Sequence, residues 1–185
     1  MKKQKSHTKL FMGIFIAFLM IASILGIIVS NPANSEEKPV YEYEGYEFYR
    51  TDTGWAVKDN ENYLPVDYLP EEVKNIAYED INLNSDKIYL AYTPGNYDAS
   101  EEYAIRKLGT FLSFEGRRLV LACNQEEGCG DIPIIDCNVD YAFSFIIGED
   151  EKIYNKDNCV MLMSNDTVDF SKEVDVVIYK TLGVL

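Results

Sequence analysis

The stretch of residues 10–30 contains no charged side chain, and it constrains this chain more than any other feature of the sequence. A helix rises about 1.5 Å per residue, so a helix over this stretch spans roughly 30 Å, the thickness of the hydrocarbon core of a bilayer. Four lysines lie within residues 1–9, and no basic residue directly follows the stretch. The positive-inside rule therefore predicts a single-pass transmembrane helix in the cell membrane, with the amino terminus in the cytoplasm and the rest of the chain outside.

A cleaved secretory signal is the alternative, because it has the same order of basic and apolar regions. The apolar run is longer than the roughly 7 to 15 residues of a signal core, which favours an uncleaved signal-anchor. Residues 33–35, Ala-Asn-Ser, form an acceptable cleavage site if the segment is removed. We therefore divide the chain into a cytoplasmic basic tail (1–9), a transmembrane helix (10–30), a polar tether (31–39) and an extracytoplasmic domain (40–185).

The exported domain is strongly acidic. All 31 acidic residues follow the apolar stretch, and the formal net charge of the chain is −14. Affinity for nucleic acids depends on neutralising phosphates with Lys and Arg, so this charge argues against a nucleic-acid partner. An acidic surface keeps a tethered domain soluble. The partners that remain are the membrane, through residues 10–30, and a protein at the cell surface.

Imidazole is absent from the exported domain, because the only histidine of the chain is His7 in the predicted cytoplasmic tail. Ser-His-Asp and Cys-His catalysis, and zinc sites with histidine ligands, are thereby excluded. Carboxylate pairs are abundant, but they fall at predicted turns and helix starts, where acids are usually solvated. No residue pattern identifies a catalytic site, and we expect no metal and no cofactor.

All cysteines of the chain lie in the exported domain: Cys123, Cys129, Cys137 and Cys159. An even number of cysteines outside the cytosol indicates disulfides, and four cysteines allow three pairings. We expect Cys123 to pair with Cys129, and Cys137 to pair with Cys159. The spacing lacks the paired short motifs of a four-cysteine zinc site.

These features predict a membrane-anchored domain that serves as a non-catalytic interaction or structural component at the cell surface. The alternative is an exported thiol-disulfide oxidoreductase that uses Cys123 and Cys129, because Cys123 ends a predicted strand of an α/β unit and sites gather at such ends. Against this alternative, the nearby acids Glu126 and Glu127 would raise the pKa of a thiol rather than lower it.

Alternating aromatic and polar residues predict an amino-terminal β-hairpin or three-strand meander within residues 40–68. A proline at position 70, followed by two acids, predicts a short helix that ends near residue 76. Behind the lysine-led anchor, the motifs EYEGYEF (42–48), Gly54-Trp55 and DYLPEEVKNI (67–76) resemble those of uncharacterised, amino-terminally membrane-anchored proteins of small-genome archaea. That resemblance covers mainly the first half of the chain and implies no known activity.

The second half predicts a βαβ unit, with strands at 87–92 and 118–123 and a helix that begins at a capping box of Asp98 and Glu101. Further strands are expected at 133–136, 141–147 and 159–163. The sequence therefore predicts an α+β fold, in which the hairpin or meander is followed by a mixed sheet and a carboxyl-terminal helix, preceded by one transmembrane helix.

A closing helix is predicted from about residue 171. Asp175 and Lys180 lie off its apolar face and are expected to stay in water. The apolar face is expected to be buried against the sheet, and it consists of Val174, Val177, Ile178 and Leu182.

Overall fold

The computed structural model describes residues 39–95, 99–165 and 170–185. The chain divides into two compact units, Met1–Lys38 and Pro39–Leu185, and the described structure belongs to the second. The predicted cytoplasmic tail, the transmembrane helix over 10–30 and nearly all of the tether lie outside the described residues. Within the described ranges, no helix is long and apolar enough to span a membrane.

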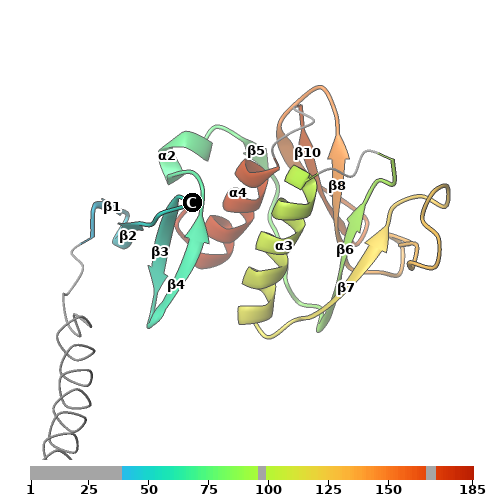
Figure 1. Ribbon diagram of the computed structural model, residues 1–185, viewed down its shortest axis with the longest axis horizontal. Coiled ribbons are helices and arrows are strands. Elements are labelled where there is room, and N and C mark those ends of the chain that lie inside the picture. Colours follow the sequence, from blue (N-terminus) through green and yellow to red (C-terminus); the bar gives the residue numbers. More distant parts are fainter. Residues whose placement is uncertain (1–38, 96–98, 166–169) are drawn as a thin grey trace, which may run out of the picture. The chain divides into compact units, whose positions relative to one another are not determined.

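The first four strands form a small antiparallel sheet in chain order (Figure 1): β1 (Tyr41–Tyr43), β2 (Tyr46–Arg50), β3 (Trp55–Asp59) and β4 (Asn62–Val66). The predicted meander is thus confirmed, with one strand more than expected. Its first turn places Glu44 and Gly45 at φ of 47° and 86°, in the left-handed region that favours glycine.

The other six strands form a mixed sheet with the order β5-β9-β10-β8-β6-β7. The central pairs β10·β8, β8·β6 and β6·β7 are parallel, β5 is parallel to β9, and β9 is antiparallel to β10. The bounds are β5 (Ala77–Tyr78), β6 (Lys87–Tyr92), β7 (Arg118–Cys123), β8 (Ala142–Ile147), β9 (Lys152–Lys156) and β10 (Cys159–Ser164).

Three helices complete the described part of the domain: α2 (Pro70–Val73), α3 (Ala99–Phe114) and α4 (Ser171–Leu182). Helix α3 joins the parallel strands β6 and β7, which confirms the βαβ unit, although Asp98 of the expected capping box lies outside the described residues. Gly109 brings α3 close to β6, because a Cβ at this position would lie 3.2 Å from Cδ1 of Leu90.

Helices α3 and α4 lie between the two sheets (Figure 1). On one side, Phe48 of β2 meets Tyr179 of α4 edge-on, with ring centroids 6.0 Å apart. On the other side, Phe145 of β8 meets Phe170, the residue before α4, at 5.4 Å. Val174, Val177 and Ile178 of α4 are at most 1% exposed, so this part of the predicted apolar face is in the core.

Three parts of the mixed sheet differ from expectation, and one of them is the two-residue strand β5, which no sequence pattern predicted. The strand expected at 133–136 does not form, and its one β-bridge joins Ile134 to Cys123. Pro133 has no amide hydrogen to donate to a longer ladder. Strand β9 was not expected, because only Ile153 among its residues is fully buried and the strand lacks a regular apolar alternation.

Candidate functional site

The predicted disulfide residues form two bridges, Cys123–Cys129 and Cys137–Cys159, which confirms the expected pairing. Cys123, at the end of β7, is 0% exposed, and Cys129 is 4% exposed. Cys159, at the start of β10, is also fully buried. The first bridge therefore ties residues 124–141 to the last residue of β7, and the second ties them to the first residue of β10.

Backbone hydrogen bonds hold the same residues, 124–141, which we call the cysteine loop. The N–H of Cys123 donates to the carbonyl of Pro133 at 2.8 Å, and the N–H of Ile135 donates to the carbonyl of Cys123 at 2.9 Å. Long loops without regular secondary structure are uncommon in compact domains, and ordered ones often carry function. The cysteine loop is therefore the first place to examine for a site.

A cavity of about 290 Å³, which we call the loop cavity, opens between the cysteine loop and the mixed sheet. It lies on the face of the sheet that the helices leave uncovered. Ser144 of β8 and Met161 of β10 pair across the strands on this face, whereas Phe143 and Phe145 point to the helices because side chains alternate along a strand. The lining consists of Asn124, Ile135, Asp136, Cys137, Asn138, Ser144, Lys156, Asp157 and Met161.

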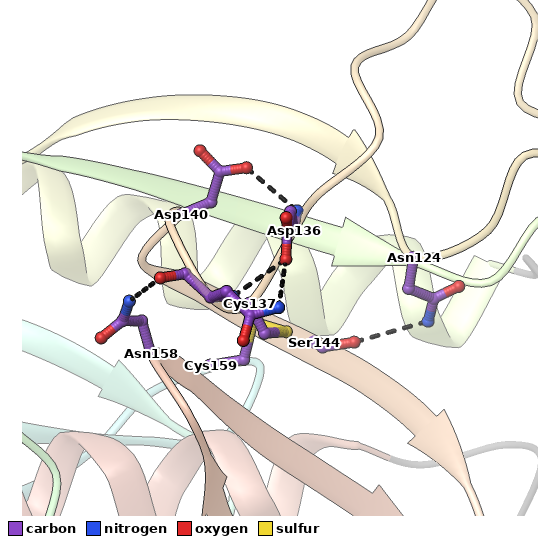
Figure 2. Close-up of a disulfide and its surroundings, with 8 residues drawn as sticks. Asn124, Asp136, Cys137, Asp140, Ser144, Asn158 and Cys159 are labelled. Carbon is purple, nitrogen blue, oxygen red and sulfur yellow. Dashed lines mark hydrogen bonds between the residues drawn. A yellow bond between two sulfur atoms is a disulfide. The ribbon is translucent and has the colours of Figure 1, made fainter.

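Ser144 lies beneath the loop cavity and is 0% exposed, so it is closed off from water. The side-chain nitrogen of Asn124 donates to Oγ1 of Thr93 at 2.8 Å and lies 3.4 Å from the carbonyl oxygen of Phe145. The same nitrogen lies 3.4 Å from Oγ of Ser144 (Figure 2). A carbonyl oxygen can only accept, so these contacts assign the nitrogen to this side of the amide and leave Oδ1 on the other. Within the described residues, Oδ1 of Asn124 accepts no hydrogen bond and the hydroxyl hydrogen of Ser144 has no acceptor.

One wall of the loop cavity carries a carboxylate in a fixed position, that of Asp136. Its Oδ1 accepts the backbone N–H of Asn138 at 3.0 Å and the side-chain N–H of the same residue at 2.8 Å (Figure 2). These hydrogen bonds stabilise the ionised form and lower the pKa of Asp136 below its ordinary value. Its backbone N–H donates to Oδ2 of Asp140 at 3.0 Å. Asp136 is therefore an ordered, charged acceptor at neutral pH.

The opposite wall comes from the turn between β9 and β10. Lys156 and Asp157 are exposed at this turn, where Asp157 has a φ of 54°. Ile135 and Met161 add apolar surface to the lining. The loop cavity thus combines hydrogen-bond donors and acceptors with a small apolar area, and its lining is more polar than that of most small-molecule sites, which are largely apolar.

A second hollow, of about 440 Å³, lies on the other side of the cysteine loop, near the starts of β6 and β8. Its lining is largely uncharged and polar, and it contains no fully buried polar side chain. The residues are Asn82, Asn84, Ser85, Val139, Tyr141 and Asn158.

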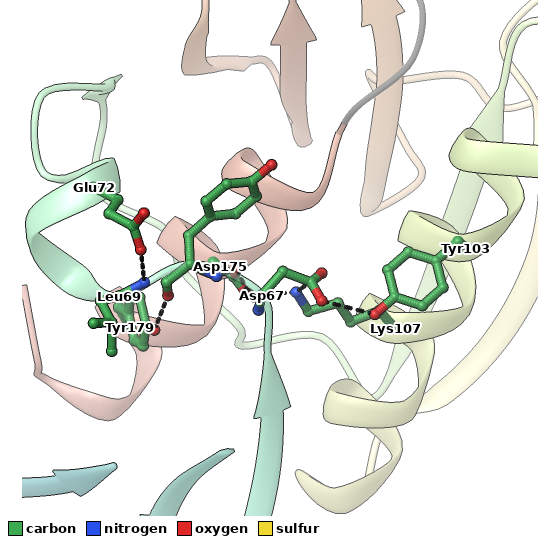
Figure 3. A network of polar contacts seen from close by, with 8 residues as sticks. Asp67, Leu69, Glu72, Tyr103, Lys107, Asp175 and Tyr179 are labelled. Carbon is green, nitrogen blue, oxygen red and sulfur yellow. Dashed lines mark hydrogen bonds and ion pairs between the residues drawn. The ribbon is translucent and has the colours of Figure 1, made fainter. Parts of the chain in front are cut away.

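A separate polar cluster lies between the helices and the small sheet (Figure 3). The ammonium of Lys107 in α3 lies 2.6 Å from Oδ2 of Asp67 and 2.6 Å from Oδ1 of Asp175 in α4. Oδ2 of Asp175 accepts the backbone N–H groups of Asp67 and Tyr68, both at 2.9 Å. The hydroxyl of Tyr103 donates to Oδ1 of Asp67 at 3.0 Å.

The expectation that Asp175 stays in water is wrong. Asp175 is 0% exposed, because the small sheet and α3 cover the side of α4 that faces away from the mixed sheet. Burial raises the pKa of Asp175 to about 6, against the attraction of Lys107 and the two backbone N–H groups. Burial and the Asp175 charge also raise the pKa of Tyr179. Lys180, in contrast, is partly exposed.

Sequence reasoning identified the cysteines but missed Asn124, Ser144 and Lys107. Signals for them are present in the sequence. Asn124 directly follows a strand, Ser144 interrupts the apolar run AFSFII of β8, and Lys107 lies three residues after Ala104 on the buried face of α3. A polar residue indicates a buried network of hydrogen bonds when it stands where the helix or strand periodicity predicts a buried apolar residue.

The described residues hold no group of three or more His, Cys, Asp or Glu side chains that could bind a metal ion. No protein-family model, no curated protein and no solved structure matches the chain.

Proposed function

We propose that this protein is a membrane-anchored extracytoplasmic domain that acts as a non-catalytic interaction or structural component at the outer face of a membrane. The observation that carries the proposal is the closure of the cysteine loop by Cys123–Cys129 and Cys137–Cys159. Disulfides form and persist in oxidising compartments, which is consistent with export. A loop fixed on a rigid scaffold is a common recognition element, which favours an interaction role.

The membrane anchor rests on the sequence of residues 10–30, which has no charge and follows four lysines. The acidic composition of the remainder supports a domain that stays soluble beside the bilayer and does not bind nucleic acid. The anchor therefore holds the cysteine loop at the cell surface in this proposal.

The alternative, a thiol-disulfide oxidoreductase that uses Cys123 and Cys129, requires sulfur atoms that a partner thiol can reach. The exposed fractions of these two residues, 0% and 4%, favour a structural bridge instead. A measurement of thiol reactivity separates the two functions.

The location is tested with the full chain carrying an epitope tag after Leu185. We expect the protein to stay with the membrane fraction after an alkaline carbonate wash, and the tag to be reached by antibody on intact cells. Release by carbonate, or a tag that is detected only after permeabilisation, would contradict the proposal.

The function is tested on the same material, prepared without reductant. We expect all four cysteines to be blocked to a thiol reagent and to remain blocked under mild reduction. If Cys123–Cys129 is reduced readily and the protein catalyses disulfide exchange in a model peptide, the oxidoreductase replaces the interaction component as the function.

A further inference from the structure

We propose that the open edge of β7 binds an extended acidic segment of a partner protein, which adds to the mixed sheet as a further strand. Binding at this edge rests on the proposed function and deepens it, since it gives the interaction component a surface and a class of partner. It is tested with peptides, whereas the proposed function is tested by membrane location and blocked thiols. A failure of one is therefore distinguishable from a failure of the other.

β7 is the outermost strand of the mixed sheet, and it pairs along its length with β6 alone (Figure 1). The N–H of Arg118 donates to the carbonyl of Asp86, beside the start of β6, at 2.9 Å. Alternate residues of a strand turn their backbone groups to the same neighbour, so Leu119 and Leu121 turn theirs to the open side. Among the described residues, no backbone hydrogen bond joins these two leucines to a further segment on that side.

The end of the same strand shows how a segment adds to this edge. Cys123 also faces the open side, and its N–H and carbonyl pair with Pro133 and Ile135 of the cysteine loop. This short pairing is parallel to β7. It ends there because Pro133 has no N–H to donate to Leu121. The rest of the edge, which bonds to none of the described residues, offers donors and acceptors to an extended backbone.

The other edge of the mixed sheet is less suited to a partner. It is formed by β5, which has only two residues. Short edge strands protect a sheet from added strands, whereas long edges with exposed apolar side chains attract them. β7 has six residues, and its Leu121 is 43% exposed. Of the two edges, β7 is therefore the one that accepts a partner strand.

Apolar surface lies on the helix side of this edge. Leu119 faces α3, because a Cβ on Gly109 would lie 3.5 Å from its Cδ1. Beside Gly109, α3 carries a hollow of about 330 Å³ that is lined by Thr110, Ser113 and Phe114. Phe114 is 59% exposed. The side chains of an added strand alternate between the two faces of the sheet, so every second one lies on the side of this hollow.

The opposite face of the edge is basic. Lys87 of β6 and Arg118 of β7 are neighbours in the parallel register. They point away from the helices, because the next residues along, Ile88 and Leu119, face the core. The two cations therefore lie side by side on the face of the sheet that the helices leave uncovered.

Neither cation forms an ion pair with a carboxylate in the described part of the chain, and Lys87 contacts the ring and hydroxyl of Tyr89 instead. Like charges side by side on a sheet are destabilising. The strands of the mixed sheet contain no Asp or Glu, although the chain as a whole has a net charge of −14. Carboxylates on an added strand would pair with both cations, so the edge selects an acidic segment.

A second copy of β7 fits this edge less well. Each copy would bring its own Lys87 and Arg118 to the same face, and like charges across neighbouring strands are destabilising. Charged residues on an edge are a common means by which proteins prevent such self-association. The partner is therefore a segment of another protein, with carboxylates at alternate positions and apolar residues between them.

The test is fluorescence anisotropy of a dye-labelled peptide, Glu-Val-Glu-Val-Glu-Val, with the full chain held in a non-ionic detergent. In the extended peptide the carboxylates share one face and the valines share the other. We expect saturable binding that weakens as the salt concentration is raised. The controls are Lys-Val-Lys-Val-Lys-Val and the acidic peptide methylated at every backbone nitrogen, and neither should bind. No binding of the acidic peptide, or equal binding of either control, would overturn the proposal.

Two variants of Leu121 locate the binding on the edge. Leu121→Pro removes the outward N–H and leaves the hydrogen bonds between β7 and β6 in place, because Leu121 faces away from β6. Leu121→Ala is the matched control, because it keeps the N–H. We expect Leu121→Pro to weaken peptide binding by about tenfold, and Leu121→Ala to weaken it by less than about threefold. Equal affinities of the two variants would overturn the assignment to β7.

The fluorescence of Trp55 reports whether each variant is folded, since the chain has one tryptophan. If Leu121→Pro does not fold, Arg118→Glu decides, with Arg106→Glu as its control. Both arginines are exposed, and both substitutions change the net charge equally. A loss of about tenfold in Arg118→Glu alone supports the proposal, and equal affinities overturn it.

Sedimentation velocity of the chain without peptide tests the other occupant, a second copy. We expect no dimer that depends on β7. A dimer of the unmodified chain that Leu121→Pro or Arg118→Glu disrupts would place a second copy on this edge and overturn the choice of partner.

Discussion

The ammonium of Lys107 lies 2.6 Å from Oδ1 of Asp175, and the two side chains are only 3% and 0% exposed. Because the same ammonium lies 2.6 Å from Asp67, one charge connects α3, α4 and the segment that leaves β4. The desolvation of such a buried group can exceed the Coulombic gain, so its net contribution to stability is small or unfavourable. We infer that the cluster specifies how the small sheet and the helices are placed against each other.

Removal of the Asp175 carboxylate should destabilise the domain strongly. In Asp175→Ala the backbone N–H groups of Asp67 and Tyr68 lose their acceptor, and Lys107 keeps one carboxylate partner. We expect the free energy of unfolding to fall by about 3 to 5 kcal/mol, the usual cost of breaking a buried ion pair. A urea titration followed by the fluorescence of Trp55 measures the change.

An exposed ion pair on the same helix provides the control. Arg106 pairs with Glu102, and the side chain of Arg106 is 73% exposed. Arg106→Ala should lower the free energy of unfolding by less than about 1 kcal/mol. Comparable losses in Asp175→Ala and Arg106→Ala would show that the buried cluster has no special role.

Asp175 should also make the stability depend on pH. Its pKa rises from 3.8 to about 6 on folding, so the folded domain binds this proton more tightly than the unfolded chain does. The stabilisation from protonation is fully present below about pH 4 and is lost as the pH rises through about 6. Between about pH 7 and pH 4, the unmodified chain should gain on the order of 1 to 3 kcal/mol relative to Asp175→Asn, in which the group does not titrate.

The comparison requires unfolding titrations of both proteins across this range of pH. Other buried acids, including Glu101 and Glu173, are present in both proteins, so the difference between the curves isolates Asp175. Parallel curves would mean that the pKa of Asp175 is the same in the folded and unfolded states.

The local pattern of the chain predicted the elements that depend on neighbouring residues. The meander, the βαβ unit, the late strands β8 and β10 and the helix α4 follow from alternation, helical spacing and turn residues. The disulfide pairing was predictable as well, because the loop from Cys123 to Cys129 is short, Cys137 precedes a late strand and Cys159 begins another.

The polar clusters could not be predicted, because they depend on contacts between distant parts of the chain. Lys107 meets Asp67 across 40 positions of sequence. Asp175 was expected in water on the basis of one buried helix face, whereas α4 has the mixed sheet on one side and the small sheet on the other. Helical periodicity describes one helix and does not reveal a second layer that covers its polar side.

The two disulfides should differ in their effect on stability. The bridge Cys137–Cys159 spans 22 positions and Cys123–Cys129 spans 6, so the first restricts the unfolded chain more. Replacing both Cys137 and Cys159 by Ala should lower the free energy of unfolding by about 2 to 4 kcal/mol, and replacing Cys123 and Cys129 should cost less. Urea titrations of the two double variants test this order, and equal losses would contradict it.

Helix α4 should behave as a core element rather than as a carboxyl-terminal tail. Ile178 is 1% exposed, and it belongs to the core cluster that also contains Phe48 and Phe145, one from each sheet. Ile178→Ala removes buried methylene and methyl groups and leaves a cavity between the layers. We expect the free energy of unfolding to fall by about 2 to 5 kcal/mol.

Thr181 supplies the matched control for Ile178→Ala, because it lies in the same helix and is partly exposed. Among the described residues, its hydroxyl bonds only to the carbonyl of Val177, one turn earlier. Thr181→Ala should change the free energy of unfolding by less than about 1 kcal/mol, since alanine is the better helix former. Removal of residues 170–185 should abolish the cooperative change in Trp55 fluorescence, because Tyr46 donates its hydroxyl to the carbonyl of Leu182 and so ties the small sheet to α4. A truncated chain that unfolds cooperatively at the same urea concentration as the full chain would show that α4 is not part of the core.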